Sequence, residues 1–161
     1  MEELKGILWR QFGAVIDMLE SSILVCPDNF WDKKDFWYSV YHTIFWIDYY
    51  SSVKPDEFSP PQPFSLSEFD PEIILPERIY LKEELLEYLE HSRKKVFLLI
   101  EGLNEETSKE RFITKNKDFN RIEIILYNMR HVQHHVGQLN LLLRQNVDVA
   151  GEWVSQTDKK Y

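Results

Sequence analysis

The sequence contains little cysteine, little glycine and few positive charges, and each shortage excludes a class of protein. The single cysteine, Cys26, can form neither a disulfide within the chain nor a cysteine-based zinc site, and a reducing compartment fits this composition. Five scattered glycines provide no phosphate-binding loop. The 19 basic residues against 27 acidic ones give a net charge of −8, which disfavours nucleic acids and anionic membranes as partners.

Long hydrophobic runs and targeting signals are missing as well. No apolar stretch approaches the roughly 18 residues that span a bilayer, and the first residues lack the pattern of a signal peptide. We therefore expect a cytoplasmic protein without a membrane partner. With 43% hydrophobic residues in a chain of 161, we expect one domain, residues 1–161, with a large core.

Hydrophobic residues recur with the period of an α-helix in four segments. The pattern predicts helices over about 3–24, 35–52, 81–100 and 121–144, and no strand. Pro27 and Gly102 are expected to end the first and third helices, and Asn120 with Glu123 to cap the fourth. The fold class is therefore predicted to be all-α, a four-helix bundle. On the third helix we expect Leu81, Leu85, Leu89, Val96 and Ile100 inward, and Glu83, Glu84, Glu87, Glu90, Arg93 and Lys94 outward.

Six of the seven prolines lie between the second and third predicted helices, at positions 55, 60, 61, 63, 71 and 76. Proline prevents a continuous helix, so this stretch predicts a long crossover that lets the second and third helices run parallel. Phe58, Phe64 and Phe69 indicate that the crossover packs on the bundle. The short connection before it predicts that the first two helices are antiparallel neighbours.

The histidines are the candidates for a metal site. His131 and His135 are four residues apart, so their rings lie on one helix face and can reach one ion. His42 lies on the aromatic face of the second helix at a similar depth and would be the third ligand. His134 is a reserve ligand, and His91 is expected in solvent. The alternative is that these rings only pack or hydrogen-bond in the core.

Other polar residues surround these histidines in the sequence. Asn128 and Gln138, each about one turn from a ligand, could bind within the site by orienting an imidazole or a bound water, or could be ordinary interior amides. Gly137 would allow another helix or a ligand to approach the backbone. Asp48 is expected to face solvent rather than act as a base.

The pattern Phe36-Trp37-Tyr38-Ser39-Val40-Tyr41-His42-Thr43-Ile44-Phe45-Trp46, followed by a Pro-rich crossing and His131-x-x-x-His135-x-Gly137-Gln138-Leu139, resembles the DinB/YfiT-like family of proposed metalloenzymes. The resemblance covers essentially the whole chain. It implies a four-helix bundle and a divalent metal, zinc or nickel, bound by His42, His131 and His135. Many members have an arginine after the last ligand, where this chain has Val136, so the substrate does not follow from the resemblance.

Three neutral imidazoles would leave coordination positions of a divalent ion open, which is typical of a catalytic site. The resemblance implies a thiol S-transferase that uses a low-molecular-weight thiol of the bacillithiol type on a small-molecule substrate, and a metal-dependent hydrolase is a further reading. The alternative is a protein without turnover that binds metal or serves as a homodimer module through its aromatic surface. Sequence alone does not separate these functions.

Overall fold

The computed structural model describes residues 1–70, 72 and 75–161 and shows four long helices around one hydrophobic core. These are α1 (Glu2–Val25), α3 (Lys34–Tyr50), α4 (Lys82–Glu101) and α5 (Arg121–Val147). They confirm the four predicted helices and the mostly helical fold. The short helix α2 (Asp28–Trp31) and the 3-10 turns η1 (Pro55–Glu57), η2 (Ser67–Phe69) and η3 (Thr107–Lys109) lie in the connections.

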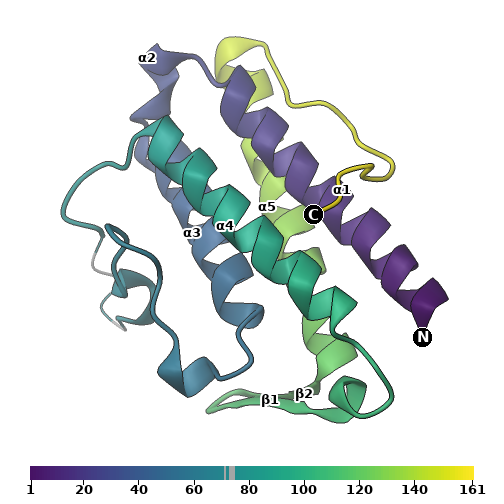
Figure 1. The fold of residues 1–161 in the computed structure, drawn as a ribbon. Coiled ribbons are helices and arrows are strands. Elements are labelled where there is room, and N and C mark those ends of the chain that lie inside the picture. Colours follow the sequence, from purple (N-terminus) through teal and green to yellow (C-terminus); the bar gives the residue numbers. More distant parts are fainter. Residues whose placement is uncertain (71, 73–74) are drawn as a thin grey trace.

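The long crossover makes α3 and α4 parallel, as predicted, while α1 and α5 run the opposite way (Figure 1). Both α1 and α3 pack against α4 and α5. The first two long helices are therefore antiparallel, but the prediction that they are neighbours is wrong. They lie across the core from each other, because α4 and α5 fill the places between them.

Most of the predicted helix ends are confirmed. The Asn120 side chain accepts a hydrogen bond from the Glu123 backbone amide, the Glu123 carboxylate accepts one from the Asn120 backbone amide, and Gly102 caps α4. Leu81 was expected inward but is 59% exposed, because α4 begins one residue later and Leu81 is its N-cap. The other four inward positions of this helix are buried.

A small antiparallel hairpin precedes α5 and contradicts the prediction that the chain contains no strand. Its strands are β1 (Arg111–Thr114) and β2 (Lys117–Asn120), with Phe112 opposite Phe119. Phe112 is fully buried and forms a second small hydrophobic cluster with Tyr50 and Ile124. The hairpin thereby closes the end of the molecule where α3 stops and α5 starts.

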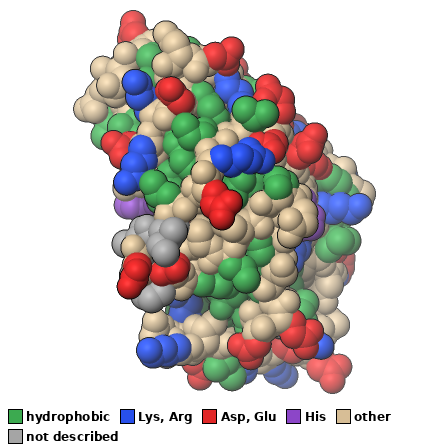
Figure 2. Space-filling view, turned by 90° about the vertical axis from the view of Figure 1, so that its left-hand side faces the viewer, with side chains coloured by type: hydrophobic (Ala, Val, Ile, Leu, Met, Phe, Trp, Pro, Cys, Tyr) green, Lys and Arg blue, Asp and Glu red, His purple; other side chains and the backbone are tan. Residues whose placement is uncertain are grey.

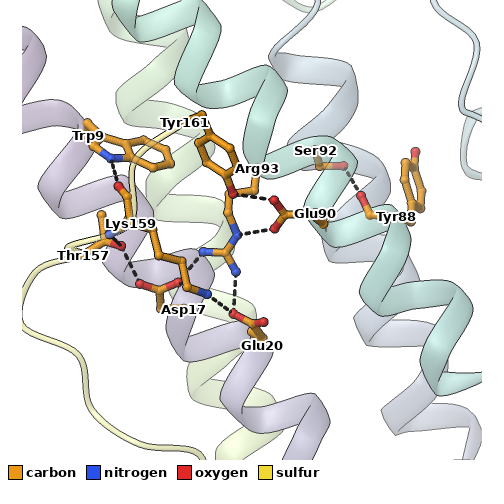
Figure 3. Close-up of polar contacts among 10 residues, drawn as sticks. All are labelled: Trp9, Asp17, Glu20, Tyr88, Glu90, Ser92, Arg93, Thr157, Lys159 and Tyr161. Carbon is orange, nitrogen blue, oxygen red and sulfur yellow. Dashed lines mark hydrogen bonds and ion pairs between the residues drawn. The ribbon is translucent and has the colours of Figure 1, made fainter.

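Arg93 contradicts its predicted outward position. Its side chain is 1% exposed and bonds to Asp17, to Glu20 at 2.6 Å and to Glu90 at 3.1 Å (Figure 3). The partners on α1 are more than 70 residues away in sequence, so the helical pattern of α4 alone could not reveal them.

The last residues run back along α1 and cover this cluster. The Thr157 hydroxyl donates to Asp17 at 2.6 Å, and the Trp9 indole donates to the Lys159 carbonyl at 2.8 Å. Lys159 adds an ion pair with Glu20 at 2.6 Å. We name Arg93, Asp17, Glu20, Glu90 and Lys159 the arginine cluster.

The surface is otherwise of mixed charge. On the face that Figure 2 shows, acidic and basic side chains are interspersed among hydrophobic ones, and histidine is visible at two opposite edges. In the described part of the chain, no helix has both the length and the apolar composition that crossing a bilayer requires.

Candidate metal centre

The aromatic residues of the crossover pack on the middle of α3 and on α4. Phe64 stacks on Tyr88 with ring centroids 4.3 Å apart, and Phe69 contacts Phe45 at 5.1 Å and Tyr49 at 4.9 Å. The Tyr41 hydroxyl donates to the Ser65 carbonyl at 2.8 Å. The prediction that the crossover packs is confirmed, although Phe69 stays 42% exposed. Pro71 lies outside the described residues. These contacts fix η2 above the centre of α3.

The three predicted ligands meet between α3 and α5. The Nε2 atom of His131 lies 3.4 Å from Nε2 of His42 and 3.1 Å from Nε2 of His135. All three potential ligand atoms lie within 4.8 Å of one another. Two nitrogens bound at about 2.05 Å by a tetrahedral zinc ion are about 3.3 Å apart, so the observed separations fit a single ion.

Glu68, in η2, contacts Nδ1 of His42, whereas Nε2 of His42 faces the other two histidines. Its Oε2 lies 2.6 Å from Nδ1 of His42 and accepts a hydrogen bond from the Trp46 indole at 3.0 Å. Only 3% of the Glu68 side chain is exposed. Burial opposes ionisation of this carboxyl, but the bond and charge of His42, with smaller effects of Tyr38 and Trp46, keep its pKa below the ordinary value. A carboxylate on Nδ1 is the usual second partner of a histidine that binds a metal through Nε2.

This bond decides which form of His42 fits the site. With its proton on Nδ1, His42 presents a lone pair at Nε2 toward the other two rings. Burial, together with the charges of neighbouring histidines, lowers the pKa of His131 to about 3. It lowers the pKa of His135 to about 4, together with the charge of His42 and against an opposing effect of Gln138. Both rings are therefore neutral at pH 7. If a single proton lay between the three Nε2 atoms, at least one of their lone pairs would have no partner. A divalent cation accepts a lone pair from each.

Unpartnered polar atoms mark the same place. Among the described residues, four buried side-chain polar atoms lack a hydrogen-bond partner: Glu68 Oε1, Asn128 Oδ1, His131 Nδ1 and His135 Nδ1. Two of them belong to the candidate ligands, one to the carboxylate behind His42, and one to a residue a turn from His131. Because buried polar groups normally have partners, this concentration indicates a site that a ligand or water completes.

The neighbours of the ligands only partly match the sequence predictions. The Asn128 amide donates to the Ile47 carbonyl at 3.1 Å and to Ser51 at 3.3 Å, so it joins α5 to the end of α3. Gln138 is exposed rather than interior. That Asn128 or Gln138 orients an imidazole or a bound water stays a prediction.

The structure also places the remaining candidates. His134 is exposed, 5.2 Å from the His135 ring, and lies outside the converging group. His91 is exposed, as expected. Val136 is fully buried in the core. A Cβ atom at Gly137 would meet nothing within 4 Å among the residues that the structure describes, so none of the described helices packs closely on its backbone.

Asp48 contradicts its predicted exposure. It is buried between α3 and α4, where it accepts a hydrogen bond from the Tyr88 hydroxyl at 3.0 Å and pairs with Lys95. The face of α3 that carries Asp48 packs on α4, which supplies both partners. Asp48 therefore joins two helices on another side of α3 from His42.

Sequence reasoning missed Glu68, the closest polar partner of the cluster. Its one signal was its position between Phe64 and Phe69, in a loop predicted to pack over the site. Comparisons of the chain with models of protein families, with curated proteins and with solved structures found no match. The candidate site therefore depends on geometry alone.

Proposed function

We propose that this protein is a DinB/YfiT-like four-helix bundle in which His42, His131 and His135 would hold a divalent metal ion, zinc or nickel. One observation carries the proposal: three imidazoles from two helices direct Nε2 at one point. Their spacing fits one ion, and two of the four buried polar atoms without partners among the described residues belong to the candidate ligands themselves.

The reaction that we propose for the site joins the sulfur of a low-molecular-weight thiol to the electrophilic carbon of a small substrate. The thiol loses its proton and the carbon loses its leaving group, which is chloride in the assay below. When bound, a divalent cation in an open three-histidine site supplies Lewis acidity and lowers the pKa of a thiol or water that it binds. The protein contributes the orientation of His42, which Glu68 fixes at 2.6 Å. It also contributes an aromatic wall, in which Trp46 lies 6.1 Å and Tyr38 6.3 Å from the His42 ring. These rings limit water and favour substrates with an apolar reactive part.

A thiol-conjugation assay tests the enzymatic part of the proposal. Protein loaded with zinc or nickel is incubated with monochlorobimane and a panel of low-molecular-weight thiols, including bacillithiol. We expect thiol-dependent conjugation above the uncatalysed rate. His42→Ala should abolish it, while His91→Ala, which removes an exposed histidine on α4, should leave it unchanged. If metal binds but no thiol reacts faster than without protein, the S-transferase assignment is wrong and a metal-binding role without this turnover is favoured.

A further inference from the structure

A cationic cavity lies on α5 directly beside the histidine cluster. Tyr127, Arg130, His131 and His134 line a hollow of about 330 Å³. His131 belongs both to this hollow and to the candidate ligands, so the hollow reaches the edge of the cluster. A molecule that occupies it would therefore lie next to the proposed metal.

The β hairpin adds a second cation at the same place. The Lys117 ammonium lies 5.2 Å from the centre of the Tyr127 ring and 5.3 Å from that of Tyr50. The Tyr50 ring is in turn 6.1 Å from the His131 ring. Lys117, from β2, therefore lies against Tyr127, an aromatic side chain of the hollow that Arg130 also lines. We name Arg130 and Lys117 the cationic mouth.

The acidic residues close to Lys117 and Arg130 in the sequence have other partners. Asp118 pairs with Arg111 at 2.8 Å, and the Glu123 carboxylate accepts the Asn120 amide at 2.8 Å. Within residues 1–70, 72 and 75–161, neither Arg130 nor Lys117 forms an ion pair. In a chain with a net charge of −8, two such cations beside the candidate site are available to an external anion.

From this arrangement we propose that the substrate of the site carries an oxyanion, a carboxylate or a phosphate, which binds at the cationic mouth. The inference rests on the proposed function and specifies its substrate class. The planar guanidinium of Arg130 can bind two oxygens of such a group, and Lys117 adds a point charge. Tyr127 packs against the carbon skeleton. The anion is held at one edge of the cluster while the apolar reactive part reaches the three imidazoles.

Direct binding of three matched probes tests this proposal. Benzoate, phenyl phosphate and neutral benzamide are titrated into zinc-loaded protein by calorimetry at low salt. We expect benzoate or phenyl phosphate to bind about tenfold more tightly than benzamide. Whichever of the two anions binds more tightly shows whether the site prefers a carboxylate or a phosphate. Arg130→Gln and Lys117→Gln should each weaken that anion by about tenfold. The control, Arg144→Gln, removes an exposed arginine about 21 Å further along α5 and should have no effect.

Two results would overturn the proposal. Benzamide binding as tightly as both anions would exclude recognition of charge. Unchanged anion binding in Arg130→Gln would show that the anion binds elsewhere, for instance on the zinc alone. Zinc stoichiometry, measured in every variant, tests the proposed function separately. If no variant takes up zinc, the proposed function fails, and titration of the metal-free protein still decides whether the cationic mouth binds anions.

Discussion

The arginine cluster and the histidine cluster are both buried polar groups between helices, but they differ in how completely they are paired. Arg93 has a carboxylate on each of three nitrogens, and Lys159 and Thr157 complete the acids (Figure 3). In the histidine cluster the ring nitrogens face one another and two Nδ1 atoms have no partner. The first arrangement is complete within the chain and has a structural role, whereas the second requires something from outside.

The largest expected effect is the loss of folding stability when the arginine cluster is broken. Arg93→Met keeps much of the side-chain volume but leaves Asp17 and Glu20 without their buried cation. We expect it to lower the free energy of unfolding by about 3 kcal/mol, measured by urea denaturation. Lys94→Met, at the exposed neighbouring position, should change it by less than about 0.5 kcal/mol. Zinc affinity should be the same in both variants, and a loss of zinc in Arg93→Met alone would contradict the separation of the two clusters.

Removing a ligand histidine should weaken zinc binding strongly and lower the folding stability only slightly. His131→Ala deletes the ring that contacts both other ligands, so we expect zinc affinity to fall at least about 100-fold, or about 2.7 kcal/mol. The metal-free protein should lose only about 1 kcal/mol of stability, because the ring is half-buried and lacks a partner at Nδ1. His91→Ala serves as the control for calorimetric zinc titration. If the two variants bound zinc with equal affinity, His131 would not be a ligand of the metal.

Glu68 connects the crossover to the histidine cluster, so its variants measure how far the loop supports the site. Glu68→Ala should weaken zinc binding about tenfold, because His42 loses the acceptor that orients its ring. Glu68→Gln should weaken it less, since an amide oxygen can still accept from Nδ1. If Glu68→Gln lost as much affinity as Glu68→Ala, the charge rather than the hydrogen bond would be the contribution of Glu68.

The last comparison concerns how the folding stability of the metal-free protein depends on pH. Histidines in the unfolded chain titrate near pH 6.5, whereas the folded pKa values of His131 and His135 are lowered to about 3 and about 4. Below pH 6.5 the unfolded chain binds protons that the folded chain does not, so folding stability falls as the pH drops from 6.5 toward 4. Urea midpoints at pH 7 and pH 5 should differ less in the double variant His131→Ala with His135→Ala. An equal difference in both proteins would contradict the lowered pKa values.

The sequence predicted what is local and periodic. The helices, the cap at Asn120 and the inward positions of α4 after Leu81 follow from spacing within one segment. The convergence of His42 with His131 and His135 followed from equal depth on two apolar helices. The misplacements of Arg93 and Asp48 share one cause. Each is a charged residue with partners on another helix, and the pattern of a single helix contains no information about those partners.

Glu68 and the hairpin were missed for related reasons. The crossover has no periodicity, so nothing in its sequence specifies which side chain reaches His42. The strands are only four residues each, and their alternation is too short to stand out. Both features are fixed by aromatic packing on α3 and α5.

Metal analysis of protein purified without a histidine tag is the sharpest test of whether the three histidines bind an ion. After incubation with zinc or nickel and removal of excess ion, we expect one equivalent per chain. X-ray absorption should show three imidazole nitrogens at about 2.0 to 2.1 Å. Less than about a tenth of an equivalent of any transition metal, before and after this incubation, would show that the three histidines bind no metal. The three histidines would then be a buried polar cluster without a metal.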